Sequence, residues 1–151
     1  MSQLITDEIK SWIGRSDEPV EFEVSKRDIV KYAIATEQKL QKYITGEEAP
    51  PMFLFGADRP LSTMDKLGPD GLRKDTLIPE LPLKRVMAGG IKKKYHGKIK
   101  PGDILTIERT ISDIFEKTGR TGPLIFVVYQ INVKNQDGEL LLQEEQTRIN
   151  R

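Results

Sequence analysis

The chain has 151 residues, of which 37% are hydrophobic and 31% are charged, a balance that indicates one soluble globular domain with a modest core. Its 24 basic and 23 acidic residues leave a net charge of +1, so composition gives no indication of a nucleic-acid partner. With no Cys and a single His, the sequence excludes disulfides, a thiolate nucleophile, and cysteine or multi-histidine metal sites. Residues 1–8 are unlike a signal peptide and no apolar run reaches membrane-spanning length, so we expect a cytoplasmic protein with no membrane partner.

Short elements are predicted for the first third of the chain. Apolar residues recur with helical spacing over residues 4–13, and Gly14 is a natural stop for that helix. Residues 19–24 alternate apolar and acidic side chains, which predicts a strand. Ser25 is placed to cap a second helix, with Asp28 at the position of a capping-box acid.

Residues 45–82 follow neither the helical nor the strand period. Six of the nine prolines of the chain lie between positions 50 and 82. An irregular span of this length inside one domain is usually functional or mobile, and the alternative is a disordered insertion.

The remaining residues predict four long strands. These cover residues 85–98, 103–115, 124–132 and 139–149, with turns at Pro101-Gly102, at residues 119–122 and at residues 135–138. Successive strands joined by such turns form a meander, so we expect an antiparallel sheet. Strands of ten or more residues need a partner surface along their length, and one long helix is too little to supply it, which predicts a dimer.

Two adjacent glycines, Gly89 and Gly90, interrupt the first of these strands. Glycine inside a strand permits close approach of a ligand or another backbone, and the alternative is that the pair accommodates a bulge. Arg85 and the lysines at 92–94 form a basic cluster beside the pair. Such a cluster suits a phosphate group, and it is equally ordinary on a solvated strand edge.

Several segments together resemble one family, the N-terminal half of the MaoC-like double-hot-dog hydratases, which include mesaconyl-CoA, itaconyl-CoA and 3-methylfumaryl-CoA hydratases. The segments are LGPDG at 67–71, LIPELP at 77–82, RVMAGG at 85–90, PGD at 101–103, ISDI at 111–114, EKTGR at 116–120 and GPLIFVV at 122–128. The similarity extends from about residue 12 to residue 151, and Met87 stands where the family usually has Trp. The resemblance implies an α+β hot-dog fold over residues 1–151, with a long antiparallel sheet wrapped around a helix and dimerisation through sheet extension.

The resemblance also implies a function. In the family an Asp and a His of the second hot dog transfer the protons, and no matching run follows the second predicted helix of this chain, where residues 35–42 read ATEQKLQK. We therefore expect a hot-dog subunit of an acyl-CoA hydratase or dehydratase whose partner, a second MaoC-like hot dog, supplies that pair. Acyl-CoA is the expected substrate, with no cofactor and no metal. By resemblance, Met87, Ala88, Gly89 and Gly90 line the acyl-pantetheine channel, and Arg85 lies beside them.

Two residues are candidates for proton transfer within this chain. His96 is the single imidazole, and its alternative role is a partly exposed residue at a strand end. Glu37 could activate water as the carboxylate of a homodimeric acyl-CoA thioesterase, although a helix-surface Glu usually faces solvent. A third reading is a non-catalytic acyl-CoA binding module.

Overall fold

The structure, a computed structural model, describes residues 3–151. Its helical elements are α1 (Asp7–Lys10), α2 (Lys26–Ala35), α3 (Gln41–Ile44) and a short 3₁₀ turn, η1 (Met64–Lys66). Its strands are β1 (Val20–Glu23), β2 (Val86–Tyr95), β3 (Ile104–Gly119), β4 (Gly122–Lys134) and β5 (Leu140–Asn150). None of the helices in this part of the chain is long and apolar enough to cross a membrane.

The two predicted N-terminal helices are present, with different lengths. The helix expected over residues 4–13 is a single turn, α1, which begins after Thr6. The cap of α2 is as predicted, because the Ser25 side chain accepts a hydrogen bond from the Asp28 backbone N–H at 3.0 Å.

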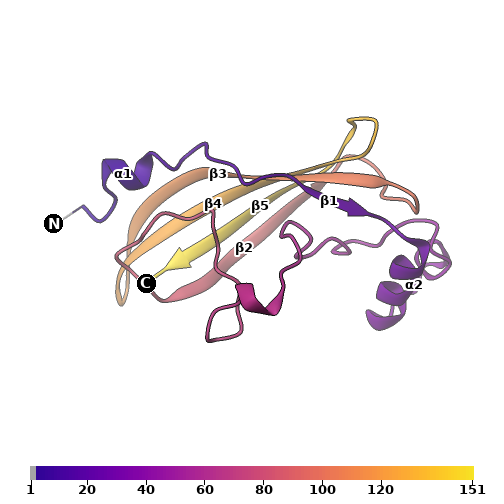
Figure 1. Ribbon diagram of the computed structural model, residues 1–151, viewed down its shortest axis with the longest axis horizontal. Coiled ribbons are helices and arrows are strands. Elements are labelled where there is room, and N and C mark those ends of the chain that lie inside the picture. The colour runs from indigo at the N-terminus through magenta and orange to yellow at the C-terminus, as the bar shows by residue number, and fades with distance from the viewer. Residues whose placement is uncertain (1–2) are drawn as a thin grey trace.

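All five strands form one antiparallel sheet in the order β1-β3-β4-β5-β2 (Figure 1). The antiparallel sheet is confirmed, and β3, β4 and β5 form the expected meander. The predicted hairpin at Pro101-Gly102 is wrong, because β2 pairs with β5 at the opposite edge from β1. The Gly102 N–H donates to the Val24 carbonyl at 2.8 Å, so this turn holds the start of β3 beside β1.

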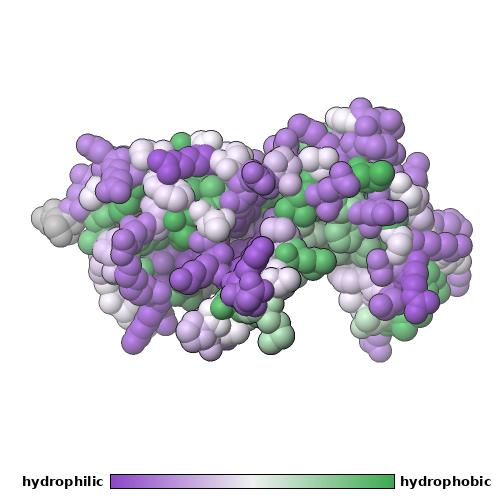
Figure 2. Space-filling model, in the orientation of Figure 1, coloured by the Kyte–Doolittle hydropathy of each residue, from purple (hydrophilic) through white to green (hydrophobic). Residues whose placement is uncertain are grey.

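Two apolar clusters lie on one face of the sheet, one toward each end. The first joins Val24 and Ile29, at the start of α2, to sheet residues that include Leu105 and Val133. The second joins Ile9 of α1 and residues 77–81 to sheet residues that include Ile125 and Val127. Thus α2 covers only one end of the sheet, and α1 lies at the other (Figure 1). The space-filling view shows hydrophobic surface on both halves of the molecule, with hydrophilic residues between them (Figure 2).

The irregular span of residues 45–82 is packed onto the sheet. Leu54, Leu77 and Leu81 are buried in the two clusters. The Tyr129 hydroxyl, on β4, donates to the Leu77 carbonyl at 2.9 Å, and the Tyr95 hydroxyl, on β2, accepts from the Met52 N–H at 3.2 Å. These contacts make the span part of the fold rather than a disordered insertion.

Candidate functional site

Strand β2 carries the residues that the sequence singled out, and it forms one edge of the sheet. It pairs with β5, and among residues 3–151 no strand lies on its other side. Four of its apolar side chains are between 41% and 53% exposed: Val86, Met87, Ile91 and Tyr95. A ten-residue edge with this much exposed apolar surface is a template for pairing with another strand.

The glycine pair forms a bulge in this edge strand. The register of β2 against β5 shifts between Ala88 and Gly90, and Gly90 has a φ of +132°, which favours glycine. A Cβ at Gly89 would lie 2.8 Å from Cγ2 of Thr147 and 2.9 Å from Cγ1 of Ile149. The bulge reading of the pair is therefore confirmed, and the two side chains that approach Gly89 closely are on β5.

The residues around the bulge face both sides of the sheet. Ala88 lies opposite Arg148, on the face that carries the apolar clusters. On the other face, Gly89 and Gly90 line a hollow of about 610 Å³ together with Phe115 and Phe126. These two rings are stacked with centroids 4.9 Å apart. Arg85 is exposed and exchanges two backbone hydrogen bonds with Arg151 beyond the end of β2.

An ionic group centred on the buried pair Arg109 and Asp75, here called the arginine cluster, lies between the two apolar clusters. Its members are Asp17, Arg59, Asp75, Arg109 and Arg148. Arg109 is 4% exposed; it donates to Asp75 at 2.8 Å and, through Nε, to Asp17 at 2.9 Å. Arg59 and Arg148 approach the second oxygen of Asp75 at 3.7 and 3.6 Å. One carboxylate on the irregular span thereby meets arginines from β3, from β5 and from the span itself.

The cluster changes the proton affinity of its members. Burial alone would raise the pKa of the Asp75 carboxyl, but hydrogen bonds and charge attraction from Arg109 outweigh it and hold that pKa below its ordinary value. Burial, together with the charge of Asp75, raises the pKa of Tyr129 to about 12. The Arg109 guanidinium lies 5.0 Å from the centre of the Tyr129 ring, a distance at which the cation and the ring attract each other.

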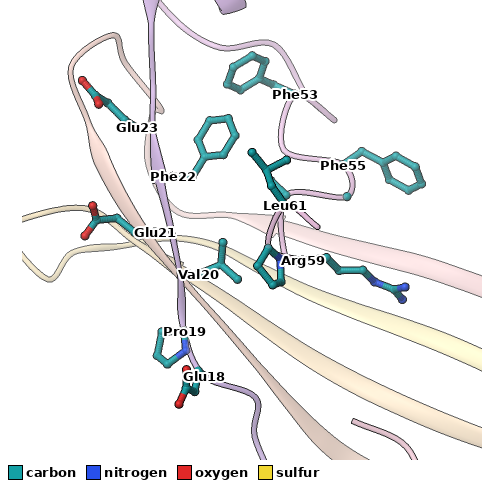
Figure 3. Close-up of a pocket in the computed structure, with 13 residues that line it drawn as sticks. Glu18, Pro19, Val20, Glu21, Phe22, Glu23, Phe53, Phe55, Arg59 and Leu61 are labelled. Carbon is teal, nitrogen blue, oxygen red and sulfur yellow. The ribbon is translucent and has the colours of Figure 1, made fainter. Parts of the chain in front are cut away.

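A cleft with a volume of about 720 Å³ lies between β1 and residues 53–61. Val20 and Phe22 point into it toward Leu61 and Phe53, whereas the acidic side chains of β1 point away (Figure 3). The Phe22 and Phe53 rings meet edge to face at 6.1 Å. A neighbouring hollow of about 540 Å³ shares Val20 and Leu61 with the cleft and extends to Asp75 and Arg109. The size and the apolar wall of the cleft suit a small-molecule ligand.

The two candidate proton-transfer residues lie apart from these features. His96 is exposed, and its Nε2 is within hydrogen-bond distance, 2.8 Å, of the Gln143 side-chain oxygen. Glu37 is exposed just beyond the end of α2, with a φ of +54°. Within the described residues, no group of three or more His, Cys, Asp or Glu is arranged to hold a metal ion.

The burial of several charged side chains was not predicted from the sequence. Lys93 and Glu144 form a buried ion pair between β2 and β5, and the Lys93 ammonium has no partner with hydrogen-bond geometry in this part of the chain. One feature of the sequence could have predicted the arginine cluster. In β3 the inward positions read Leu105, Ile107, Arg109 and Ile111, and an arginine within such an alternation indicates a buried partner of opposite charge.

Comparison with known proteins identifies the family. Residues 11–144 match the family described as the FAS1-like dehydratase domain region. The chain belongs to this family. It is also 29% identical over 144 residues to the mesaconyl-C(4)-CoA hydratase of Chloroflexus aurantiacus. That match covers 93% of this chain and 50% of the hydratase, so the FAS1-like dehydratase domain spans half the length of the curated relative.

Solved structures confirm the α+β hot-dog fold. The HadBC (3R-hydroxyacyl-ACP dehydratase) complex of Mycobacterium tuberculosis contains a chain that aligns with a TM-score of 0.67 at 16% identity, over 97% of this chain and all of that one. A chain of the ChsH1-ChsH2 complex of the same organism aligns with a TM-score of 0.66 at 18% identity, over 94% of this chain and 90% of that one. At these identities the likeness concerns the fold alone.

Proposed function

We propose that the chain is one hot-dog subunit of an acyl-CoA hydratase or dehydratase, which adds water reversibly to a 2-enoyl-CoA. It contributes the acyl- and CoA-binding half, and a partner hot-dog subunit supplies the catalytic Asp and His. The observation that carries this proposal is the 144-residue match to half of a mesaconyl-C(4)-CoA hydratase. The open edge at β2 supports it, because an edge strand can continue its sheet into a second hot dog.

The positions of His96 and Glu37 support an external source of the proton-transfer groups. Hydration requires a base for water, an acid for the alpha carbon and donors for the thioester oxygen, all within reach of one acyl group. His96 contacts Gln143, and Glu37 lies beyond the end of α2, so neither stands beside the bulge of β2. A partner's Asp and His could approach the same strand from its open side.

The acyl thioester is the substrate in this proposal, and the reaction requires no cofactor or metal. The segment Met87, Ala88, Gly89 and Gly90 lies beside the acyl channel, with Arg85 available to a phosphate of CoA. The small side chain of Ala88, which lies opposite Arg148, supports this role, because a methyl group obstructs a neighbouring ligand less than a larger side chain would.

The proposal is tested by assaying the chain alone and together with the partner that co-purifies at native levels. With crotonyl-CoA as the probe, we expect hydration by the complex and none by the isolated chain. Full hydratase activity of the isolated chain would remove the need for a partner. Release of free CoA, abolished by Glu37→Ala, would instead identify a thioesterase, and tight binding of acyl-CoA without turnover would identify a binding module.

A further inference from the structure

Basic residues dominate the part of the sequence that forms the open edge. Residues 81–102 contain seven Lys or Arg residues and no Asp or Glu, although the net charge of the whole chain is only +1. Within this stretch Arg85, Lys92 and Lys94 are exposed. Like charges directly opposite each other destabilise a pair of strands, whereas opposite charges stabilise it. The charge of β2 therefore bears on which strand can pair with it.

The pairing of β2 with β5 already follows this rule. Lys92 lies directly opposite Glu145, and Lys93 lies directly opposite Glu144. The Lys92 ammonium is 3.6 Å from the Glu145 carboxylate, and Lys93 forms the buried ion pair with Glu144. Strand β5 thus places acids opposite Lys92 and Lys93, whereas Lys94 lies opposite Gln143. The Lys92 side chain remains 86% exposed.

A second copy of β2 fits this edge poorly. Two copies would pair in antiparallel fashion, and most registers bring like charges together. In registers centred near 88–89, residues 84–85 of one copy lie opposite the lysines at 92–94 of the other. In registers centred near 92–94, the lysines of the two copies lie opposite each other. Registers centred close to Gly90 and Ile91 avoid these contacts. There, however, the strand is bulged and Gly90 has a φ of +132°, which interrupts regular pairing.

We infer that β2 selects a different chain, whose edge strand carries Asp or Glu opposite Arg85, Lys92 and Lys94. Lys93 takes no part in this choice, because Glu144 already neutralises it. Complementary charge across an interface decides between partners and speeds their encounter. The occupant is the partner hot dog, so the inference rests on the proposed function and specifies the chemistry of that partner.

The test uses a charge-reversed copy of the chain as a partner of known composition. This copy carries Arg85→Glu, Lys92→Glu and Lys94→Glu, and it is mixed with the wild type in sedimentation velocity at 0.1 M and 1 M NaCl. The matched control carries Arg27→Glu, Lys31→Glu and Lys39→Glu. These exposed residues lie on or just after α2, and their reversal changes the net charge equally without touching β2.

At 0.1 M salt we expect a one-to-one complex of the wild type with the reversed copy. It should be about tenfold or more tighter than self-association of the wild type or its mixture with the control. At 1 M salt, where charges are screened beyond about 3 Å, the preference should disappear. Thermal unfolding checks that the reversed copy folds, and a neutral copy with Gln at the same three positions should associate to an intermediate extent.

Three results would overturn the inference: a stable wild-type homodimer that the reversal does not disturb, equal association of the reversed copy and the control, or no association of either mixture. Because this test measures association and not turnover, its outcome is separate from that of the hydratase assay. A homodimer that hydrates crotonyl-CoA, for example, would refute the charge selection while leaving hydration as the function.

Discussion

Replacing Asp75 with Ala should destabilise the fold substantially, because this carboxylate is the main partner of a buried guanidinium. The Arg109 side chain is 4% exposed and that of Asp75 is 9% exposed. Breaking a buried ion pair on one side costs roughly 3–5 kcal/mol, since the other charge remains buried without compensation. Arg109 keeps its contact with Asp17, which is 25% exposed, so we expect a loss near the lower limit, about 3 kcal/mol.

Urea denaturation measures this loss directly. With a slope of about 2 kcal/mol per molar urea, a destabilisation of about 3 kcal/mol lowers the midpoint by about 1.5 M. Asp65→Ala is the control, because Asp65 is an exposed acid in η1, on the same irregular span, and its removal should change stability by less than about 0.5 kcal/mol. Combining Asp75→Ala with Arg109→Met should cost less than the sum of the single changes.

A decrease of less than about 1 kcal/mol in the free energy of unfolding of Asp75→Ala would contradict a stabilising buried pair, because that is the range measured for solvent-exposed pairs. Additive effects of the two changes would also contradict it, because additivity would mean that Asp75 and Arg109 do not stabilise each other in the folded protein.

Four further substitutions have outcomes that can be measured. The folded-state pKa of Asp75 lies below its unfolded value near 3.9. The stabilisation by its charge is therefore complete above that pH and is lost as the pH falls further. Asp75→Asn should accordingly flatten the acid limb of a plot of urea midpoint against pH. The fold raises the pKa of Tyr129 to about 12. The contribution of its neutral hydroxyl to stability is therefore complete below pH 10 and is lost as the pH rises toward 12. A steep alkaline limb in the same plot of urea midpoint that survives Tyr129→Phe would contradict this. Gly89→Ala should lower the free energy of unfolding by about 1–3 kcal/mol, because the new Cβ meets β5 side chains at 2.8–2.9 Å. An unchanged melting temperature would mean that these side chains move aside without cost. His96→Ala should leave the hydration rate of the assembled enzyme within about twofold, whereas a loss of about 100-fold would assign proton transfer to this chain.

Local features of the sequence predicted local structure well. The Ser25 cap depends on a side chain and a backbone N–H three residues apart, so sequence spacing alone determines it. The glycine pair predicted either a ligand contact or a bulge, and the structure confirms the bulge because Gly90 has a positive φ that other residues rarely adopt. The place of the pair in a substrate channel stays a prediction.

Contacts between distant residues could not be predicted in the same way. The turn at Pro101-Gly102 was read as a hairpin because it separates two strands, but β2 pairs instead with β5, from Val86 opposite Asn150 to Tyr95 opposite Leu142. The partners Asp75 and Arg109 are separated by 34 positions, and no spacing rule joins them. The alternation of β3 does place Arg109 on its inward face. Because a buried charge needs a counter-charge, the sequence could have indicated that Arg109 has an acidic partner, but not which one.

The arginine cluster holds the irregular span, which forms one wall of the 720 Å³ cleft, against the sheet. Helix α2 covers one end of the sheet, and α1 with residues 77–81 covers the other. Over the middle of this face, Asp75 attaches the irregular span to β3 and β5 through ion pairs with Arg109 and Arg148. An ionic contact is more directional than apolar packing, because its energy depends on the positions of the guanidinium donors. Residues 53–61, which form one wall of the 720 Å³ cleft, are tied to the same carboxylate through Arg59. Loss of the Asp75 charge should therefore release residues 53–61, and with them this wall of the cleft, while both apolar clusters remain intact.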